Sequence, residues 1–305
     1  MDASPELLVN EAFGERADAA LLLADAPDLP YDWVGDPSKL PAPVEKTALL
    51  SFSPSGVQFR EWLPARLARA WRSPNGAVYC TGSHGQVMLL TPGGYRVEQV
   101  VDADDAMLSF VMGFGGKTEN EDIVLAFSGL RAFLRVGGKW SEIAVPEDAE
   151  KLISADGRTA NEVYWVTAGG VFLWDGREVT PVEGPNDELR GVLVRPNGDM
   201  LMTGMNALHV WSEGAQKWTR QKAPVRLRAG MAEQNGVVFL ATGEGVLRWD
   251  GKTFEMDAQG FDTIGFSTVG TQLFVMGGDE GLRMRRSNEW VPVAVPMSLL
   301  PPEPR

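Results

Sequence analysis

Short apolar runs separated by polar turns dominate the chain, and within each run the side chains alternate with a period of two. Residues 237–241, 245–249 and 253–256 are three such runs, and Asp250-Gly251 lies between the last two. Asp-Gly between two β-rich runs indicates a tight hairpin, because a type I′ turn needs positive φ at both central positions. With residues 227–231 as a first strand, the pattern predicts a four-stranded antiparallel meander.

The same unit recurs at intervals of about 40 residues, a period typical of propellers and other repeat folds. Trp174-Asp175-Gly176, Trp211-Ser212-Glu213-Gly214 and Trp249-Asp250-Gly251 close the third run of three successive units. The third run of each unit opens on a Gly or Asn: Gly85, Gly129, Gly170, Asn206, Gly245 and Gly281. A large residue follows the next turn at Tyr95, Trp140, Trp218, Phe254 and Trp290, with Val179 as the exception. These positions predict six units.

Radial four-stranded blades explain both the repeat and the strand count. A two-layer sandwich lacks so regular a repeat, and the coils of a solenoid are shorter and carry no tight Asp-Gly hairpins. We therefore predict an all-β, six-bladed β-propeller over residues 66–295. Residues 1–65 are predicted to be an N-terminal extension, and residues 296–305 a C-terminal tail.

The Trp-Asp-Gly positions carry a resemblance to a known group. Over about residues 66–295 the chain resembles the bacterial WDG-type, regulator-like and WD40-like propellers. It departs from WD40 proteins because no Gly-His dipeptide leads the blade. Residues 154–159 resemble the Asp-box of sialidases, but we place them between a first and a second strand. The resemblance implies a fold and no activity, because one fold hosts many functions.

The first 65 residues lack the repeat and predict a short helical and Pro-rich segment. Ser4-Pro5-Glu6 indicates a helix start, with a capping hydroxyl, a proline at the first helical position and an acid in the first turn. We expect one or two short helices that include Leu7, Leu8, Phe13 and residues 19–23. Five prolines make residues 25–43 an extended connector: Pro27, Pro30, Pro37, Pro41 and Pro43.

Residues 48–52 and 57–62, joined through Ser53-Pro54-Ser55-Gly56, predict a β-hairpin. This hairpin could begin a seventh blade that the C-terminal tail completes, or it could pair with the last blade and help to close the ring. Because residues 263–295 already supply four strands to the last blade, we predict six blades with an appended hairpin. Seven blades are the alternative.

Composition is typical of a single globular domain, with 305 residues of which 44% are hydrophobic. The one cysteine, Cys80, lies in the apolar run Val78-Tyr79-Cys80, where a core thiol is expected. The acidic N-terminus lacks the basic region of a signal peptide. No apolar stretch approaches the roughly 20 residues that span a bilayer. We expect a cytoplasmic protein that does not insert into membranes.

Candidate chemistry is sparse. The two histidines, His84 and His209, have no second ligand at metal-binding spacing, and there is no cysteine cluster. Ser267 lies in Gly265-Phe266-Ser267-Thr268-Val269, which fails the nucleophile-elbow pattern, and residues 113–116 are not followed by the Gly-Lys-Ser/Thr of a phosphate loop. We predict no catalytic residue, metal or cofactor. A paired-carboxylate glycosidase remains open, because its two acids could come from different blades.

Charge supplies the functional signal, since the formal net charge is -13. In a meander, the links from strand two to three and from one blade to the next lie at the same end of the propeller. That end carries a predicted binding set of acidic residues: Asp102, Asp104, Asp105, Glu147, Asp148, Glu150, Asp187, Glu188, Glu244, Asp262, Asp279 and Glu280. Glu183 and Asp257 belong to the same links, and only Lys151, Arg190 and Lys222 oppose them. The other end mixes both signs.

A negative field at one end argues against nucleic acid and anionic lipid, and it favours a basic protein partner. The alternative is that acidic links only keep the protein soluble. We predict a non-enzymatic interaction module, for example an immunity protein bound to a toxin or a component of a bacterial assembly. A carbohydrate-binding or carbohydrate-cleaving propeller is the second possibility.

Overall fold

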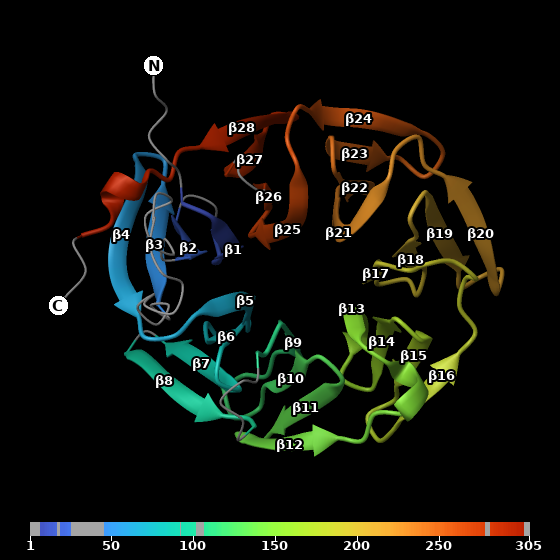
Figure 1. Ribbon diagram of the computed structural model, residues 1–305, viewed down its shortest axis with the longest axis horizontal. Helices are drawn as coiled ribbons and strands as arrows, with labels where there is room; N and C mark the ends of the chain where they lie inside the picture. The colour runs from blue at the N-terminus through green and yellow to red at the C-terminus, as the bar shows by residue number, and fades with distance from the viewer. Residues whose placement is uncertain are drawn as a thin grey trace, which may run out of the picture.

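The computed structural model describes residues 7–16, 19–25, 46–91, 93–101, 107–277 and 281–301. Within these ranges the chain forms seven four-stranded antiparallel sheets, each a meander of consecutive strands. Two short 3-10 helices, η3 (Glu147–Ala149) and η4 (Met297–Leu299), accompany them. None of the helices in the described ranges is long and apolar enough to cross a membrane. The protein is therefore a seven-bladed β-propeller (Figure 1).

The blades follow one another along the chain. Their strands are β1 (Val9–Phe13), β2 (Ala20–Asp25), β3 (Thr47–Ser53) and β4 (Gly56–Leu63) in blade 1; β5 (Leu67–Arg72), β6 (Val78–Gly82), β7 (Gln86–Thr91) and β8 (Gly94–Gln99) in blade 2; β9 (Phe110–Phe114), β10 (Ile123–Ser128), β11 (Arg131–Val136) and β12 (Lys139–Ile143) in blade 3; β13 (Leu152–Thr159), β14 (Glu162–Thr167), β15 (Gly170–Trp174) and β16 (Val179–Val182) in blade 4; β17 (Gly191–Val194), β18 (Met200–Thr203), β19 (Ala207–Ser212) and β20 (Lys217–Lys222) in blade 5; β21 (Leu227–Gln234), β22 (Val237–Thr242), β23 (Gly245–Trp249) and β24 (Phe254–Gln259) in blade 6; and β25 (Thr263–Val269), β26 (Gln272–Gly277), β27 (Leu282–Arg286) and β28 (Glu289–Val293) in blade 7.

The six-blade prediction is wrong by one blade. The predicted hairpin is confirmed as β3 and β4, but β1 and β2 complete its sheet, not the C-terminal tail. The helix prediction for Leu7, Leu8, Phe13 and residues 19–23 is wrong, because Phe13 ends β1 and residues 20–23 lie in β2. A short continuous apolar run is consistent with either a buried strand or a buried helix, so periodicity alone could not decide. The predicted helix start at Ser4-Pro5-Glu6 and the connector beyond Asp25 lie outside the described residues.

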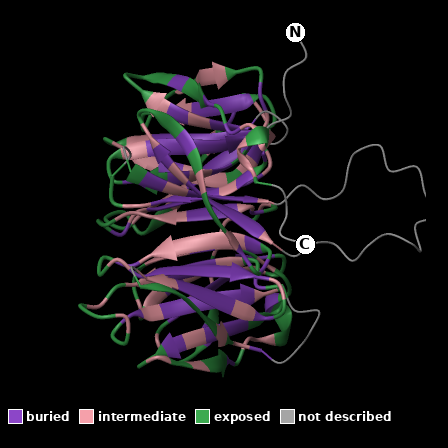
Figure 2. Cartoon of the chain, turned by 90° about the vertical axis from the view of Figure 1, so that its left-hand side faces the viewer, coloured by how far each residue is buried: buried purple, intermediate pink, exposed green. Residues whose placement is uncertain are grey.

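Seven hydrophobic clusters hold the ring together, one at each interface between neighbouring blades. Alternate side chains of one strand enter different clusters, because successive residues point to opposite faces of a sheet. In β2, Leu22 packs toward blade 7 and Leu23 toward blade 2. The strand is therefore buried on both faces, which explains its continuous apolar sequence. Figure 2 shows the buried residues within the sheets and the exposed ones mainly at the turns and links.

Within the described residues, the first and the last blade exchange no strand, so side-chain contacts and a backbone hydrogen bond close the ring at the seam between them. The hydroxyl of Ser267 on β25 donates to the carboxyl group of Glu11 on β1 and accepts from the Ala12 N–H at 3.3 Å. The Leu7 N–H donates to the Val295 carbonyl at 2.9 Å. Burial raises the pKa of Glu11, and the nearby Arg69 opposes this only in part. The seam thus holds a carboxyl group whose neutral form the fold favours.

Side chains also pair neighbouring inner strands elsewhere in the ring. Ser154 and Asp156 on β13 accept hydrogen bonds from the backbone N–H groups of Val192 and Val194 on β17, at 3.3 and 2.7 Å. These donors lie on the inner edge of their sheet, where no fifth strand satisfies them. The prediction that the Asp-box-like residues 154–159 lie between two strands is wrong, because they are part of β13.

A repeated clamp joins the outer parts of two blade pairs. Between blades 2 and 3, the Glu98 carboxylate accepts from Arg135 at 2.9 Å and from the Trp140 indole at 2.7 Å. Burial would raise the pKa of Glu98, but these hydrogen bonds, the positive charge of Arg135 and a hydrogen bond from Arg96 together outweigh it and hold the pKa below its ordinary value.

The same arrangement recurs between blades 6 and 7. Asp257 accepts from the Trp290 indole at 2.6 Å, and the Arg285 guanidinium lies 3.4 Å from the same carboxylate. The Arg285 guanidinium also lies over the Phe239 ring. Asp257 is therefore a residue of β24 in a structural ion pair, not the acid in an exposed link that we predicted.

We expect Trp249→Ala to lower the free energy of unfolding by about 3 to 5 kcal/mol, because Trp249 is buried in the cluster between blades 5 and 6. Trp211 has the equivalent position in blade 5, but it is only half-buried and its indole donates to Glu213 at 3.1 Å. Trp211→Ala should therefore lower the free energy of unfolding by less than Trp249→Ala does. Urea unfolding of both variants measures the difference, and equal losses would contradict this view of the repeated tryptophans.

The acid dependence of stability provides a test of the β13–β17 contact. Burial raises the pKa of Asp156 from 3.8 to about 6, and the Val194 and Gly157 N–H groups oppose this only in part. Because the folded pKa lies above the unfolded one, the contribution of Asp156 is complete below about pH 4, and it is lost as the pH rises through about 6. As the pH rises from about 4 to about 6 and beyond, the free energy of unfolding of the wild type should fall by up to about 3 kcal/mol relative to that of Asp156→Asn. Urea unfolding across the pH range measures this, and parallel profiles for the two proteins would contradict it.

Candidate functional site

The ring has two distinct ends. We call the end with the links from strand two to three and from blade to blade the connecting face, and the end with the other turns the hairpin face. Seven predicted acidic residues are described and lie in links of the connecting face: Glu147, Asp148, Glu150, Asp187, Glu188, Glu244 and Asp262. Asp102, Asp104, Asp105, Asp279 and Glu280 lie outside the described residues. The site therefore consists of three groups of links, between blades 3 and 4, 4 and 5, and 6 and 7.

The first group is the link from β12 to β13. It contains η3, whose Ala149 is buried in the cluster between blades 3 and 4 and fixes the helix to the ring. The link packs closely on the β14–β15 turn, where a Cβ on Gly169 would lie 1.8 Å from the Asp148 carbonyl oxygen. Glu147, Asp148 and Glu150 project into solvent from this anchored backbone.

The second group is the link from β16 to β17. Asp187 lies 2.8 Å from Nε2 of the buried His209 on β19, and Glu188 pairs with Arg190 at 2.6 Å. Partial burial would raise the pKa of Asp187, but the hydrogen bonds from His209 and from the Glu188 N–H outweigh it, so its pKa is lowered. Asp187 therefore holds the link to blade 5 as an ionised, partnered carboxylate.

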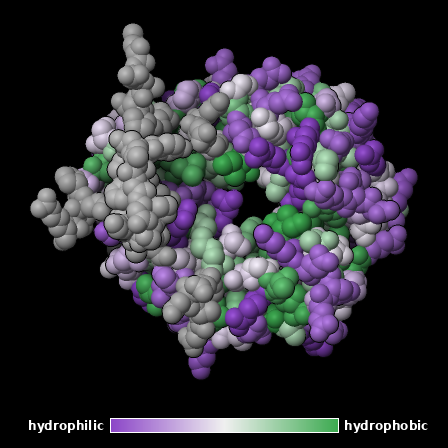
Figure 3. Space-filling view, in the orientation of Figure 1, coloured by the Kyte–Doolittle hydropathy of each residue, from purple (hydrophilic) through white to green (hydrophobic). Residues whose placement is uncertain are grey.

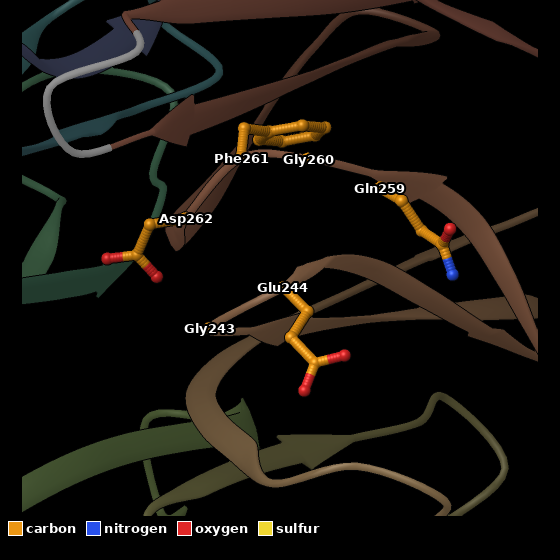
Figure 4. Close-up of a pocket in the computed structure, with 6 residues that line it drawn as sticks. All are labelled: Gly243, Glu244, Gln259, Gly260, Phe261 and Asp262. Carbon is orange, nitrogen blue, oxygen red and sulfur yellow. The ribbon is translucent and has the colours of Figure 1, made fainter.

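The third group surrounds a pocket of 500 Å³ between blades 6 and 7, lined by Gly243, Glu244, Gln259, Gly260, Phe261 and Asp262 (Figure 4). The Gly260 N–H donates to the Glu244 carbonyl at 3.1 Å and ties the two links together. Gly245 has a φ of +141°, and a Cβ there would lie 2.1 Å from the Ala258 carbonyl oxygen. This glycine is needed for the close approach of the two links. The pocket is therefore a fixed feature of the connecting face.

An aromatic ring and an ion pair complete the pocket. Phe261 is buried and lies beneath the Arg283 guanidinium, which is 4.2 Å from the ring centroid. Asp262 pairs with Arg228 at 2.7 Å, with both side chains well exposed. In Figure 4 the Glu244 and Asp262 side chains point in different directions. The pocket therefore offers two separate negative groups, of which one is already partnered.

The connecting face also carries cations that we did not predict. Arg66 and Arg226 lie in links, and Arg228 is the second residue of β21. Asp187, Glu188 and Asp262 each have a basic partner, whereas four acids have no side-chain partner within the described residues: Glu147, Asp148, Glu150 and Glu244. Counting the residues at the first positions of each inner strand would have found Arg228. The described acids that carry no ion pair on this face are therefore fewer than the predicted set.

No catalytic arrangement emerges from the described residues. They include no group of three or more His, Cys, Asp or Glu residues placed to hold a metal ion. Ser267 belongs to the buried seam, and burial raises the pKa of Cys80 and disfavours its thiolate. His209 is a buried strand residue paired with Asp187. Among the described residues, Ser267, Cys80 and His209 are therefore buried groups of the core or of an ion pair.

No protein-family model and no curated protein sequence matches the chain. Solved structures match it at the level of fold. A catalytically inactive virginiamycin B lyase from Staphylococcus aureus with quinupristin has a TM-score of 0.68 at 10% identity, covering 91% of this chain and 94% of that chain. The WD40 β-propeller domain of Doa1 has a TM-score of 0.65 at 10% identity, covering 94% and 96%. YCF48 bound to a D1 peptide has a TM-score of 0.65 at 12% identity, covering 96% and 97%.

These similarities establish a WD40-like β-propeller fold. At such low identity they carry no activity, because propellers host many functions.

Proposed function

We propose that the protein is a non-enzymatic interaction propeller that docks a basic protein partner on its connecting face. The observation that carries this proposal is the placement of four acids without side-chain partners among the described residues, on links anchored to a rigid ring. Charged side chains around an interface raise the association rate and select against partners of the wrong sign. An immunity protein that binds a toxin and an assembly factor that binds a component are both examples of such an interaction propeller.

The peptide-bound YCF48 structure supports the proposal as an example of a propeller of the same fold that binds a protein segment. The carbohydrate alternative has less support from the site. A sugar-binding platform needs an exposed aromatic face, whereas Phe261 is buried beneath Arg283. Within the described residues, the exposed large aromatic side chain is Tyr95, on the outer strand β8.

A charge-reversal pair tests the docking face. Glu147→Lys with Glu244→Lys changes two exposed acids of the connecting face, and Glu178→Lys with Glu289→Lys makes the same change on the hairpin face. Immobilised wild type and both variants are exposed to extract from the source cell, and retained proteins are identified by mass spectrometry. We expect a basic protein that the wild type and the hairpin-face variant retain. The connecting-face variant should bind it about tenfold more slowly.

Equal retention by both variants would contradict the assignment of the face. Retention of acidic proteins alone, or of no protein at all, would contradict the basic partner.

Removing the cation that neutralises Asp262 tests the proposal in the opposite direction. We expect Arg228→Gln to accelerate binding of the captured partner, because it leaves the Asp262 carboxylate without its 2.7 Å partner. The free energy of unfolding should change by less than about 1 kcal/mol, since both side chains are exposed. Arg158→Gln is the control, because Arg158 is partly exposed and pairs with Glu162 at the β13–β14 turn of the hairpin face. Stopped-flow association measures both, and slower binding by Arg228→Gln would contradict the proposal.

A further inference from the structure

Exposed apolar side chains gather on the connecting face. Nine large hydrophobic side chains are exposed within the described residues, and five of them lie at this end: Leu8, Met107, Leu130, Ile153 and Ile264. Tyr95 and Val97 lie on the outer strand β8, Val136 is next to the β11–β12 turn, and Val291 is on β28. Single exposed apolar residues are ordinary on a protein surface, and these five belong to several blades; what they share is the face that also carries the unpartnered acids.

Two of these residues lie at the mouth of the central opening. Ile153 is the second residue of β13 and Ile264 the second residue of β25, at 39% and 41% exposure. The inner strands begin at the connecting face, and blades 4 and 7 stand on different sides of the opening (Figure 1). Figure 3 shows this face, with hydrophobic side chains at the rim of the opening among hydrophilic ones. A ligand that contacts both isoleucines must cross the opening.

The acids lie farther from the axis than the isoleucines. Glu147, Asp148 and Glu150 are in the link that leads from the outer strand of blade 3 to the inner strand of blade 4, and Glu244 is in the link between the two middle strands of blade 6. Apolar side chains at the centre with charged groups around them are the usual anatomy of a protein interface. Arg228 has the same position in β21 as the isoleucines in β13 and β25, but it is already paired with Asp262. The four carboxylates without side-chain partners would repel phosphate groups, so a cationic and partly apolar polypeptide is the complementary ligand.

We propose that the connecting face binds a basic amphipathic segment of its partner, laid across the central opening. The apolar side chains of the segment cover Ile153 and Ile264, and its Lys or Arg side chains reach Glu147, Asp148 and Glu244. This inference rests on the proposed function for the choice of face and for the sign of the partner's charge. It adds that the partner presents a chain segment with apolar residues between its cations, rather than a uniformly polar basic surface.

Two synthetic peptides of equal length and charge test the inference by fluorescence anisotropy: one alternates Lys with Leu, and the other alternates Lys with Ser. We expect the Lys–Leu peptide to bind the wild type about tenfold more tightly. Ile153→Thr with Ile264→Thr should remove most of this advantage and leave binding of the Lys–Ser peptide unchanged. Threonine keeps the β-branched shape that suits a strand, so the fold should persist. Val136→Thr with Val291→Thr is the matched control away from the opening and should bind as the wild type does.

The outcomes separate the two proposals. Equal affinity for the two peptides would overturn the amphipathic segment but leave the acidic docking face in place. The same holds if the isoleucine and valine variants lose equal affinity for the Lys–Leu peptide. Binding of neither peptide by the wild type would overturn both proposals. A loss confined to the Lys–Leu peptide in the isoleucine variant supports the inference.

Discussion

The structure depends on the burial of every blade against two neighbours. Each sheet presents apolar side chains on both faces, and the ring must close so that no face is left exposed. Six interfaces join consecutive segments of the chain, but the seventh joins blade 1 to blade 7 without an exchanged strand. Closure of the ring, and with it the burial of the other six interfaces, therefore depends on the hydrophobic cluster at that seam and on the Glu11–Ser267 contact.

The closed ring also fixes the positions of the links that form the candidate site. The three groups of links described above are anchored to the ring by the buried Ala149, the Asp187–His209 pair and the Gly260–Glu244 hydrogen bond. Anchored links present side chains in fixed positions, which lowers the entropy that binding a partner must overcome. Part of the acidity serves this anchoring and is neutralised locally. The proposed docking surface combines the remaining exposed acids with the apolar side chains Ile153 and Ile264.

The sequence predicted most of the fold because Asp-Gly turns and the Trp positions of blades 4 to 6 are local signals. Blade 1 escaped prediction because β2 is buried on both faces, and its Leu21-Leu22-Leu23 run has no strand-like alternation. The acidic links could be predicted from topology alone. Asp262 and Arg228, at opposite ends of blade 6 in the sequence, pair without leaving a local pattern. The Arg135–Trp140 and Arg285–Trp290 intervals are identical and could have indicated the clamps.

Amide hydrogen exchange, measured with and without the alternating Lys–Leu peptide, tests most directly whether the connecting face is the interaction surface. Backbone amides in links exchange slowly when a ligand covers them. We expect slower exchange in residues 144–151, 243–245 and 260–262, and at the first residues of β13 and β25. The hairpin-face turns at residues 235–236 and 250–253 should exchange at the same rate with or without peptide. Protection of those turns, with none in the links, would contradict the assignment of the connecting face.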